Sequence, residues 1–159
     1  MQSLSLLGEY EVSLDAKGRF RLPGGLIAQL GHPGGLDLVV NCGFEQCLTL
    51  YPRSVWDAIQ ERINLNYFDR KSRAFARFFR RGAQEVSPDS ADRILLPKRL
   101  LDYAGADKKL ILICLKDRIE IWAKAEYDRV PDEEEFDFSA LAQDVLGNGL
   151  GDSGPPAAP

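Results

Sequence analysis

Two stretches of this 159-residue chain decide its organisation: EVSLDAKGRFRLP at residues 11–23 and EVSPDSADRILLP at residues 85–97. They align at an offset of 74 with seven identities in thirteen positions. Further on, LTLY at residues 48–51 aligns with IEIW at residues 119–122 at an offset of 71, so the second copy is three residues shorter between the two matches. A match that continues in the same order along the chain indicates two copies of one supersecondary unit.

The repeat divides the chain into four parts. We expect a first repeat with its helix at residues 5–63, a linking helix at 64–82 and a second repeat at 83–127. Residues 128–159 carry one basic and eight acidic side chains and end in GPPAAP. Such a segment cannot bury enough apolar surface to offset the entropy lost on ordering it, so we expect a disordered acidic tail.

Each repeat begins with two short strands that flank a tight turn. In the first repeat, the Asp15 side chain can accept hydrogen bonds from backbone amides, and Gly18 can adopt the left-handed conformation. Asp89 and Asp92 occupy the same positions in the second repeat. Because Asp tolerates a positive φ better than most residues, we expect the same turn in both repeats.

The remaining elements follow in the same order in both repeats. Proline at the start and glycine at the end predict a two-turn helix in each repeat, and stretches rich in β-forming residues predict strands. The expected helices span residues 23–31, 54–63, 69–82 and 97–105, and the expected strands span 9–14, 19–22, 36–40, 48–51, 109–115 and 118–122. The sequence therefore predicts an α+β fold with two pseudo-symmetric repeats.

The linking helix has two chemically different faces. Five arginines fall within an arc of about 100° at 100° per residue, and three phenylalanines occupy another sector. The arginines are Arg70, Arg73, Arg77, Arg80 and Arg81, and the phenylalanines are Phe75, Phe78 and Phe79. For this helix we favour packing between subunits over direct contact with nucleic-acid bases.

The charge balance differs between the repeats and the tail. The whole chain has 20 basic and 24 acidic residues, a net charge of −4 that would by itself argue against a polyanionic partner. Residues 1–127, however, hold 19 basic and 16 acidic side chains, a net of +3, whereas residues 128–159 have a net charge of −7. The repeats can therefore present a basic surface.

The sequence lacks motifs for enzymatic chemistry and for metals. His32, the only histidine, lies in a GHPGG stretch typical of a solvated loop, and no Ser-His-Asp or Cys-His signature accompanies it. Cys42 and Cys47 lack the second ligand pair of a structural zinc site, and neither GG pair begins a phosphate-binding loop. We therefore expect no enzymatic activity, no metal and no cofactor.

The cysteines and the lengths of the apolar runs indicate in which cellular compartment to expect the protein. Three cysteines without paired spacing favour a reducing environment. The N-terminus lacks the basic start and the apolar run of a secretory signal. The longest apolar stretch, residues 110–115, is far short of the roughly 20 residues that span a bilayer. We expect a cytoplasmic protein with no membrane role.

Basic side chains gather at the two turns and just after them. Lys17, Arg19 and Arg21 belong to the first repeat, and Arg93, Lys98 and Arg99 belong to the second. Arginine reads guanine edges with two hydrogen bonds and also pairs with phosphate, so two matched hairpins could meet neighbouring segments of double-stranded DNA. From residue types alone, an ion pair of each turn arginine with Asp15 or Asp89 is an equally good interpretation.

A series of motifs occurs in order between residues 5 and 127. They are GEY at 8–10, SLDAKGR at 13–19, LP at 22–23, LYP at 50–52, RAFARFF at 73–79, GA at 82–83, RILLP at 93–97, DYAG at 102–105 and IEIW at 119–122. In this order the motifs resemble the MraZ family of bacterial transcriptional regulators, which are built from two SpoVT-AbrB-type repeats. The resemblance implies that the two repeats form a swapped-hairpin barrel.

The resemblance also implies a function. It implies a nucleoid-associated repressor of its own division and cell-wall gene cluster, acting as a ring-like homo-oligomer on tandem promoter boxes. Asp15 and Arg19 match the first family motif, and Asp89 and Arg93 match the second. The two arginines are the expected base contacts and the two aspartates hold the turns. Phosphate contacts are expected from Lys17, Arg21, Lys98 and Arg99.

The sequence departs from the family pattern in one stretch of each repeat. Gly24 and Gly25 stand where the family has a basic helix start, which removes one source of phosphate contacts. In the second repeat, Asp92 adds a negative charge beside Arg93. These departures keep a second hypothesis open, in which the chain is an oligomeric protein-interaction scaffold with weak or lost DNA binding.

Overall fold

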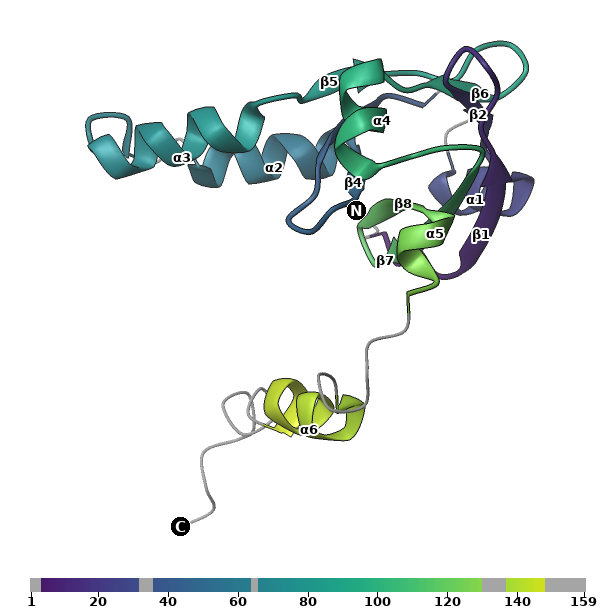
Figure 1. Ribbon diagram of the computed structural model, residues 1–159. Coiled ribbons are helices and arrows are strands. Elements are labelled where there is room, and N and C mark those ends of the chain that lie inside the picture. The colour runs from purple at the N-terminus through teal and green to yellow at the C-terminus, as the bar shows by residue number, and fades with distance from the viewer. Residues whose placement is uncertain (1–3, 32–35, 64–65, 130–136, 148–159) are drawn as a thin grey trace. The chain divides into compact units, whose positions relative to one another are not determined.

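The two repeats fold into the same series of elements, as the internal repeat predicts (Figure 1). The first repeat consists of β1 (Glu9–Ser13), β2 (Arg19–Arg21), α1 (Gly24–Leu30), β3 (Leu38–Cys42), β4 (Leu48–Pro52) and α2 (Arg53–Ile63). The second consists of β5 (Gln84–Val86), β6 (Arg93–Leu95), α4 (Lys98–Ala104), β7 (Lys109–Leu115), β8 (Arg118–Ala123) and α5 (Lys124–Tyr127). Helix α3 (Arg70–Arg80) links the two repeats.

The computed structural model describes residues 4–31, 36–63, 66–129 and 137–147. Residues 1–128 form one unit, which contains both repeats, and residues 129–159 form another. His32 and the acidic run at residues 132–135 lie outside the described residues. None of the described helices is both long and apolar enough to cross a membrane.

The strand order of the larger sheet is symmetric about its centre. The order is β1-β7-β8-β4-β3-β5, and neighbouring strands are antiparallel. β1 of the first repeat pairs with β7 of the second, and β5 of the second pairs with β3 of the first. The first strand of each repeat therefore pairs with a strand of the other repeat. Thr49 pairs with Glu120, its equivalent in the other repeat, so a pseudo-twofold axis passes between them. The two-repeat α+β fold expected from the sequence is confirmed.

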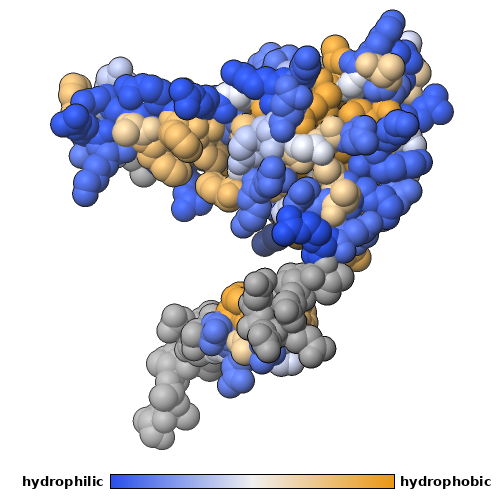
Figure 2. Space-filling model, in the orientation of Figure 1, coloured by the Kyte–Doolittle hydropathy of each residue, from blue (hydrophilic) through white to orange (hydrophobic). Residues whose placement is uncertain are grey.

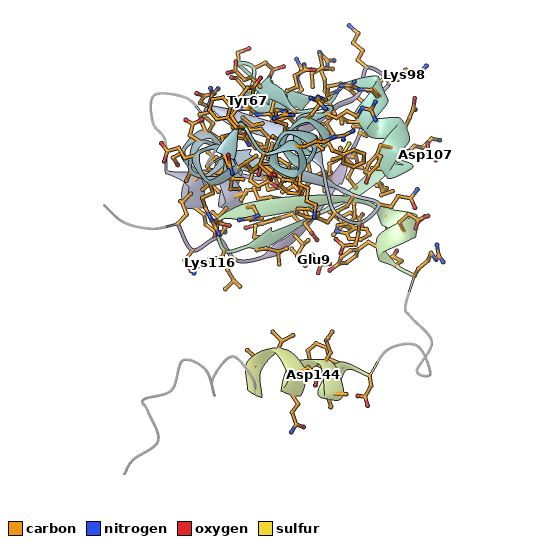
Figure 3. All side chains as sticks on the ribbon, turned by 90° about the vertical axis from the view of Figure 1, so that its left-hand side faces the viewer. Glu9, Tyr67, Lys98, Asp107, Lys116 and Asp144 are labelled. Atoms are coloured by element: carbon orange, nitrogen blue, oxygen red, sulfur yellow. The ribbon has the colours of Figure 1, made fainter. Side chains whose placement is uncertain are left out.

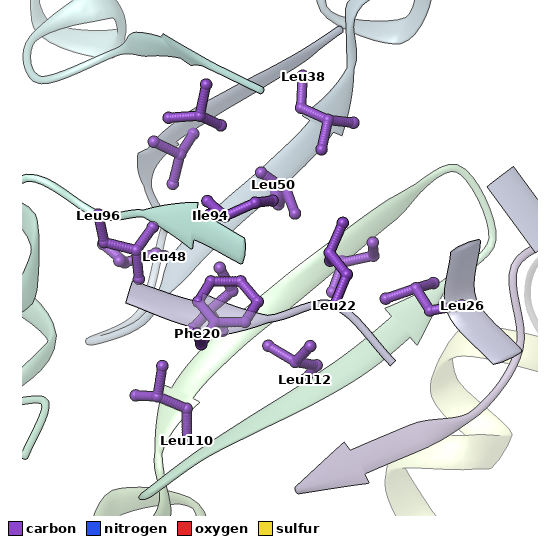
Figure 4. Packing of buried hydrophobic residues seen from close by; sticks show 14 of the residues in the cluster. Phe20, Leu22, Leu26, Leu38, Leu48, Leu50, Ile94, Leu96, Leu110 and Leu112 are labelled. Carbon is purple, nitrogen blue, oxygen red and sulfur yellow. The ribbon is translucent and has the colours of Figure 1, made fainter. Parts of the chain in front are cut away.

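Both repeats contribute to one core. Phe20 and Ile94, which are equivalent positions, pair directly in a second, two-stranded sheet made of β2 and β6, and they are 1% and 0% exposed. Figure 4 shows them close to Leu50 and Leu112 of the six-stranded sheet. Full burial of a large apolar side chain contributes about 1.5–3 kcal/mol. Because neither repeat encloses these side chains alone, the stability of each repeat depends on the other.

Helices α2 and α3 lie side by side and extend from the sheets (Figure 1). The rings of Trp56 and Phe79 stack with their centroids 5.6 Å apart, and the Asn41 side-chain amide donates to the carbonyl of Phe79 at 2.6 Å. Helix α2 begins at Arg53, one residue before the expected start, and the Arg53 guanidinium pairs with Asp57. We call helices α2 and α3 together the α2–α3 arm; the contacts of Trp56, Phe79 and Asn41 hold it against the sheet.

The acidic tail contains a short helical segment. Helix α6 (Phe138–Ala142) begins at Asp137, whose carboxylate accepts a hydrogen bond from the Ala140 amide, and it continues into a π-helical turn at Gln143–Gly147. Asp144 lies on this segment in Figure 3. The sequence predicted no element at these residues, because their composition is acidic and lacks a long apolar period.

Candidate nucleic-acid interface

The β2–β6 pair forms a two-stranded ribbon with one buried side and one outward side. Arg19 pairs with Leu95, and Arg21 pairs with Arg93, on either side of the buried Phe20–Ile94 pair. Successive side chains in a strand point to opposite faces, so residues flanking the buried pair point outward. We call this outward surface the ribbon face, and its residues are Arg19, Arg21, Arg93 and Leu95.

The first turn is held together by one carboxylate. Oδ1 of Asp15 accepts hydrogen bonds from the backbone amides of Lys17 and Arg19, both at 2.9 Å. Its Oδ2 accepts from Nε of Arg19 at 2.8 Å, and the Asp15 amide donates to the Arg19 carbonyl. The side chain therefore fixes both the shape of the turn and the direction of the Arg19 guanidinium.

The second turn repeats this arrangement atom for atom. Oδ1 of Asp89 accepts from the backbone amides of Ala91 and Arg93, both at 2.9 Å, and Oδ2 accepts from Nε of Arg93 at 2.9 Å. Asp92 occupies the place of glycine and adopts a φ of 61°. In both repeats, the turn arginine is thus oriented by a hydrogen bond from its Nε to the aspartate of the same turn.

Each turn is also tied to the strand of the other repeat. The Leu96 amide donates to the carbonyl of Gly18 at 2.9 Å, and the Leu22 amide donates to the carbonyl of Asp92 at 2.8 Å. Gly18 has a φ of 85°, so both acceptors lie in left-handed residues. In addition, Nε of Arg21 donates to the carbonyl of Ala91 at 3.0 Å. The ribbon therefore sets the spacing between the two turns.

The turn arginines form the expected ion pairs and still keep part of each guanidinium exposed. Arg19 and Arg93 form ion pairs with Asp15 and Asp89 through Nε, yet their side chains are 26% and 38% exposed. Within the described part of the chain, no hydrogen bond is made by the Nη atoms of either arginine. Arginine has five N–H donors in a fork, so an ion pair through Nε leaves the Nη edge for a ligand.

The aspartates remain charged at neutral pH. The backbone hydrogen bond from Arg19 is the largest cause that lowers the pKa of Asp15, and the hydrogen bond from the Arg19 side chain adds to it. The backbone hydrogen bond from Arg93 lowers the pKa of Asp89 in the same way. Hydrogen bonds to the ionised form favour that form, so both turns keep their acceptors under physiological conditions.

The other expected basic residues occupy different places. Lys17 is exposed in the first turn, and Lys98 is exposed at the start of α4, where it extends from the body in Figure 3. Arg99 lines a groove beside Cys42 and Gly82, with its Nη2 atom 3.7 Å from the position of a Cβ on Gly82. The structure therefore associates Arg99 with this groove.

The groove beside Arg99 is apolar and lies against α3. It has a volume of about 420 Å³ and is lined by the rings of Phe44, Phe75 and Phe78. These three residues are 74%, 52% and 75% exposed. Figure 2 shows apolar side chains gathered along the α3 arm, bordered by hydrophilic ones. We call this surface the phenylalanine groove; sequence periodicity predicted the two residues on α3 but not Phe44, which lies in a turn.

Leu95 is the ribbon-face residue that the sequence did not single out. It is 55% exposed, whereas its chain neighbours Ile94 and Leu96 are 0% and 2% exposed. The RILL stretch shows no alternation between polar and apolar residues, so its outward member could not be recognised. The alignment with Arg21 at the repeat offset of 74 was the available signal.

Among the residues that the structure describes, one group of side chains could hold a cation by distance alone. The Cys47 thiol and the carboxylates of Glu45 and Glu120 lie within 4.8 Å of one another. Burial, followed by the two nearby carboxylates, raises the pKa of Cys47 to about 12. Glu120 also accepts a hydrogen bond from the Trp122 indole at 3.0 Å. The group offers three ligand atoms rather than the four of a structural zinc site, and exposed carboxylates often lie together without an ion, so we assign it no metal.

Comparisons with known proteins agree with this architecture. The family model described as "MraZ protein, putative antitoxin-like" matches twice, at residues 5–78 and 79–148. A solved structure, that of PHS018 from Pyrococcus horikoshii, aligns with a TM-score of 0.32 and 14% identity over 76% of this chain and 89% of that one. That likeness adds nothing to the family match.

Three relatives each bear the name "Transcriptional regulator MraZ". The Christiangramia forsetii protein is 37% identical over 91% of this chain and 95% of its own length. The Desulforamulus reducens protein is 36% identical over 88% of this chain and 96% of its own. The Flavobacterium psychrophilum protein is 37% identical over 91% of this chain and 93% of its own. With two family matches and near-complete coverage, this chain belongs to the MraZ family.

Proposed function

We propose that this chain is a transcriptional regulator that binds double-stranded DNA through the ribbon face. The observation that carries the proposal is the matched pair of turns, in which Arg19 and Arg93 are each held through Nε by an aspartate of their own repeat. The names of the relatives support a role in transcription. In the form implied by the family, the chain represses its own division and cell-wall gene cluster, in the cytoplasm at the nucleoid.

The proposed recognition uses the major groove. A two-stranded ribbon fits a groove about 12 Å wide, and the two Nη donors of an arginine match O6 and N7 of guanine. Arg19 and Arg93 thus read bases. Lys17, Arg21 and Lys98 contact phosphates, because they are exposed cations near the same surface. We leave Arg99 out of this set, since it lines the phenylalanine groove.

Assembly is part of the proposal. The phenylalanine groove exposes three aromatic side chains to solvent, and we assign a second copy of the chain as the partner that covers them. Large exposed apolar patches mark interaction sites in soluble proteins. Linked copies bound to tandem boxes gain affinity because the second contact is intramolecular. This matches the ring-like oligomer implied by the family.

The test is a titration of the full chain with two duplexes. One duplex carries the region upstream of its own gene, and the other is a shuffled duplex of equal length. Three phosphate contacts give a slope of about −2.7 in log affinity against log salt, so the dissociation constant should rise about 40-fold between 50 and 200 mM salt. The upstream duplex should bind more tightly at both concentrations.

The interaction scaffold is the competing outcome. Gly24, Gly25 and Asp92 lower the positive charge near the turns, and the phenylalanine groove could serve assembly without DNA. A scaffold would show no binding to either duplex at 50 mM salt while remaining oligomeric. Equal binding to both duplexes would instead leave a DNA-binding protein without sequence preference.

A further inference from the structure

The ribbon face carries one apolar side chain among three guanidinium groups. Leu95 pairs directly with Arg19, and its neighbour on the same face of β6 is Arg93. Hydrogen bonds from Leu22 to Asp92 and from Leu96 to Gly18 flank the ribbon. By the alternation of antiparallel ladders, the Arg19–Leu95 pair is then of the narrow, non-hydrogen-bonded kind, in which side chains approach most closely.

Leu95 breaks the symmetry of this face. Its equivalent in the first repeat is Arg21, which donates through Nε to the carbonyl of Ala91 in the opposite turn. Leucine cannot form the matching bond to the first turn. Its Cδ1 atom instead lies 4.0 Å from the position of a Cβ on Gly18, beside the turn that presents Arg19. The two halves of the face are therefore chemically different.

A leucine beside a base-reading arginine has a specific complement in DNA. Among the four bases, thymine alone presents a methyl group, at C5, in the major groove, and apolar side chains contact it there. We propose that Leu95 determines specificity by packing against the C5-methyl group of a thymine next to the base read by Arg19. This inference rests on the proposed function, because it assumes that the ribbon face meets the major groove.

The experiment compares thymine with uracil, which lacks only this methyl group. The full chain is titrated with the upstream duplex and with the same duplex synthesised with uracil in place of thymine. One buried methyl group is worth about 0.8 kcal/mol, so the wild-type chain should bind the uracil duplex about fourfold more weakly. Leu95→Ala should bind the thymine duplex about fourfold more weakly and should not distinguish the two duplexes.

A matched variant controls for general effects of removing an exposed leucine. Leu115 lies at the end of β7 and is 43% exposed, so Leu115→Ala should keep the wild-type ratio of affinities. Equal affinity of the wild-type chain for both duplexes would overturn the inference and leave the proposed function intact. An unchanged ratio in Leu95→Ala would also overturn it, because another group would then read the methyl. Failure to prefer the upstream duplex over a shuffled one would instead remove the proposed function itself.

Discussion

Arg21 of the first repeat and Arg93 of the second are direct partners across the β2–β6 ribbon. Like charges at directly opposed positions destabilise a sheet. Both side chains are held in place through Nε, Arg21 by the carbonyl of Ala91 and Arg93 by the carboxylate of Asp89. The carboxylate of Asp89 offsets the charge of Arg93, so the two opposed guanidinium groups are tolerated at this pair of positions.

The first prediction concerns the two turn arginines. Arg19→Ala and Arg93→Ala should each weaken binding to the upstream duplex by about 1–3 kcal/mol, or roughly 5- to 150-fold, because each removes a bidentate base contact. Binding to a shuffled duplex should change far less. Fluorescence anisotropy with both duplexes measures the difference. Arg62→Ala, at the exposed end of α2, removes the same charge away from the ribbon and serves as the control.

Equal losses on both duplexes would reduce Arg19 and Arg93 to phosphate contacts. In that case the slope of log affinity against log salt should become shallower by about 0.9 for each variant. Base contact and phosphate contact are therefore distinguishable with the same samples.

The organisation of the fold could be predicted from the sequence because the repeat is long and its motifs stay in order. The turns at Asp15 and Asp89 follow from local chemistry, since each aspartate caps amides two and four residues ahead. Strand pairing between the repeats could not follow from local chemistry, because it joins residues about 74 or 100 positions apart, as in Phe20 with Ile94 and Glu9 with Ile113. The family resemblance supplied that part.

The candidate site was less predictable than the fold. Residue type alone grouped Arg99 with Arg93, and it gave no sign that the Arg99 side chain, in the first turn of α4, also lines the phenylalanine groove. Leu95 was hidden in an apolar run, and only its register opposite Arg19 places it on the ribbon face. For both residues the direction of the side chain, and not only its type, determines which surface it joins.

The second prediction concerns acid stability. Asp15 and Asp89 have pKa values below the ordinary value of 3.8, chiefly because of backbone hydrogen bonds. A lowered folded pKa contributes stability that is complete above the unfolded value and is lost as pH falls through the folded value. The midpoint temperature of unfolding should therefore not depend on these two groups near neutral pH. It should decrease as the pH is lowered below about 4.

Asp15→Asn and Asp89→Asn isolate this effect, because asparagine keeps an acceptor for the turn amides but does not titrate between pH 2 and 4. The double variant should show a shallower loss of stability with acid than the wild-type chain, measured by thermal unfolding from pH 7 to pH 2.5. An identical acid profile would show that other carboxylates dominate.

The third prediction concerns the left-handed residue of the second turn. Asp92 has a φ of 61°, where Gly18 stands in the first repeat. Asp92→Gly should raise the free energy of unfolding by about 0.5–1 kcal/mol, as relief of the left-handed conformation outweighs the entropy of glycine. It should also tighten DNA binding, because a negative charge leaves the vicinity of Arg93. Asp92→Asn keeps the tolerance of a positive φ and removes the charge, so it should tighten binding without the gain in stability.

The fourth prediction restores a cation that the first repeat lacks. Gly24 is the equivalent of Lys98, and a Cβ built at this position meets no atom within 4 Å. Gly24→Lys should therefore be tolerated, and its salt slope for DNA binding should steepen by about 0.9. Gly24→Ala shares the gain in helix propensity without the charge and should leave the slope unchanged. If both variants gave the wild-type slope, the result would show that bound DNA does not contact the start of α1.

The fifth prediction tests the phenylalanine groove as the contact between copies. Phe78 is 75% exposed and lines the groove, so Phe78→Asp should leave the fold intact while placing a charge where the proposed partner packs. Loss of one buried ring and the added charge should weaken assembly by about 10- to 100-fold. Light scattering after size exclusion should then show smaller species at micromolar concentration.

Phe68→Asp is the matched control for this experiment. Phe68 is 91% exposed and lies outside the groove, before α3, so its replacement introduces the same charge without touching the proposed contact. Its oligomer should keep the wild-type mass. Linked copies bind tandem boxes more tightly because the second contact is intramolecular. Phe78→Asp should therefore also lose more affinity for a duplex with several boxes than for a duplex with one. An unchanged mass for Phe78→Asp would show that the phenylalanine groove is not the contact between copies and direct the search for that contact elsewhere.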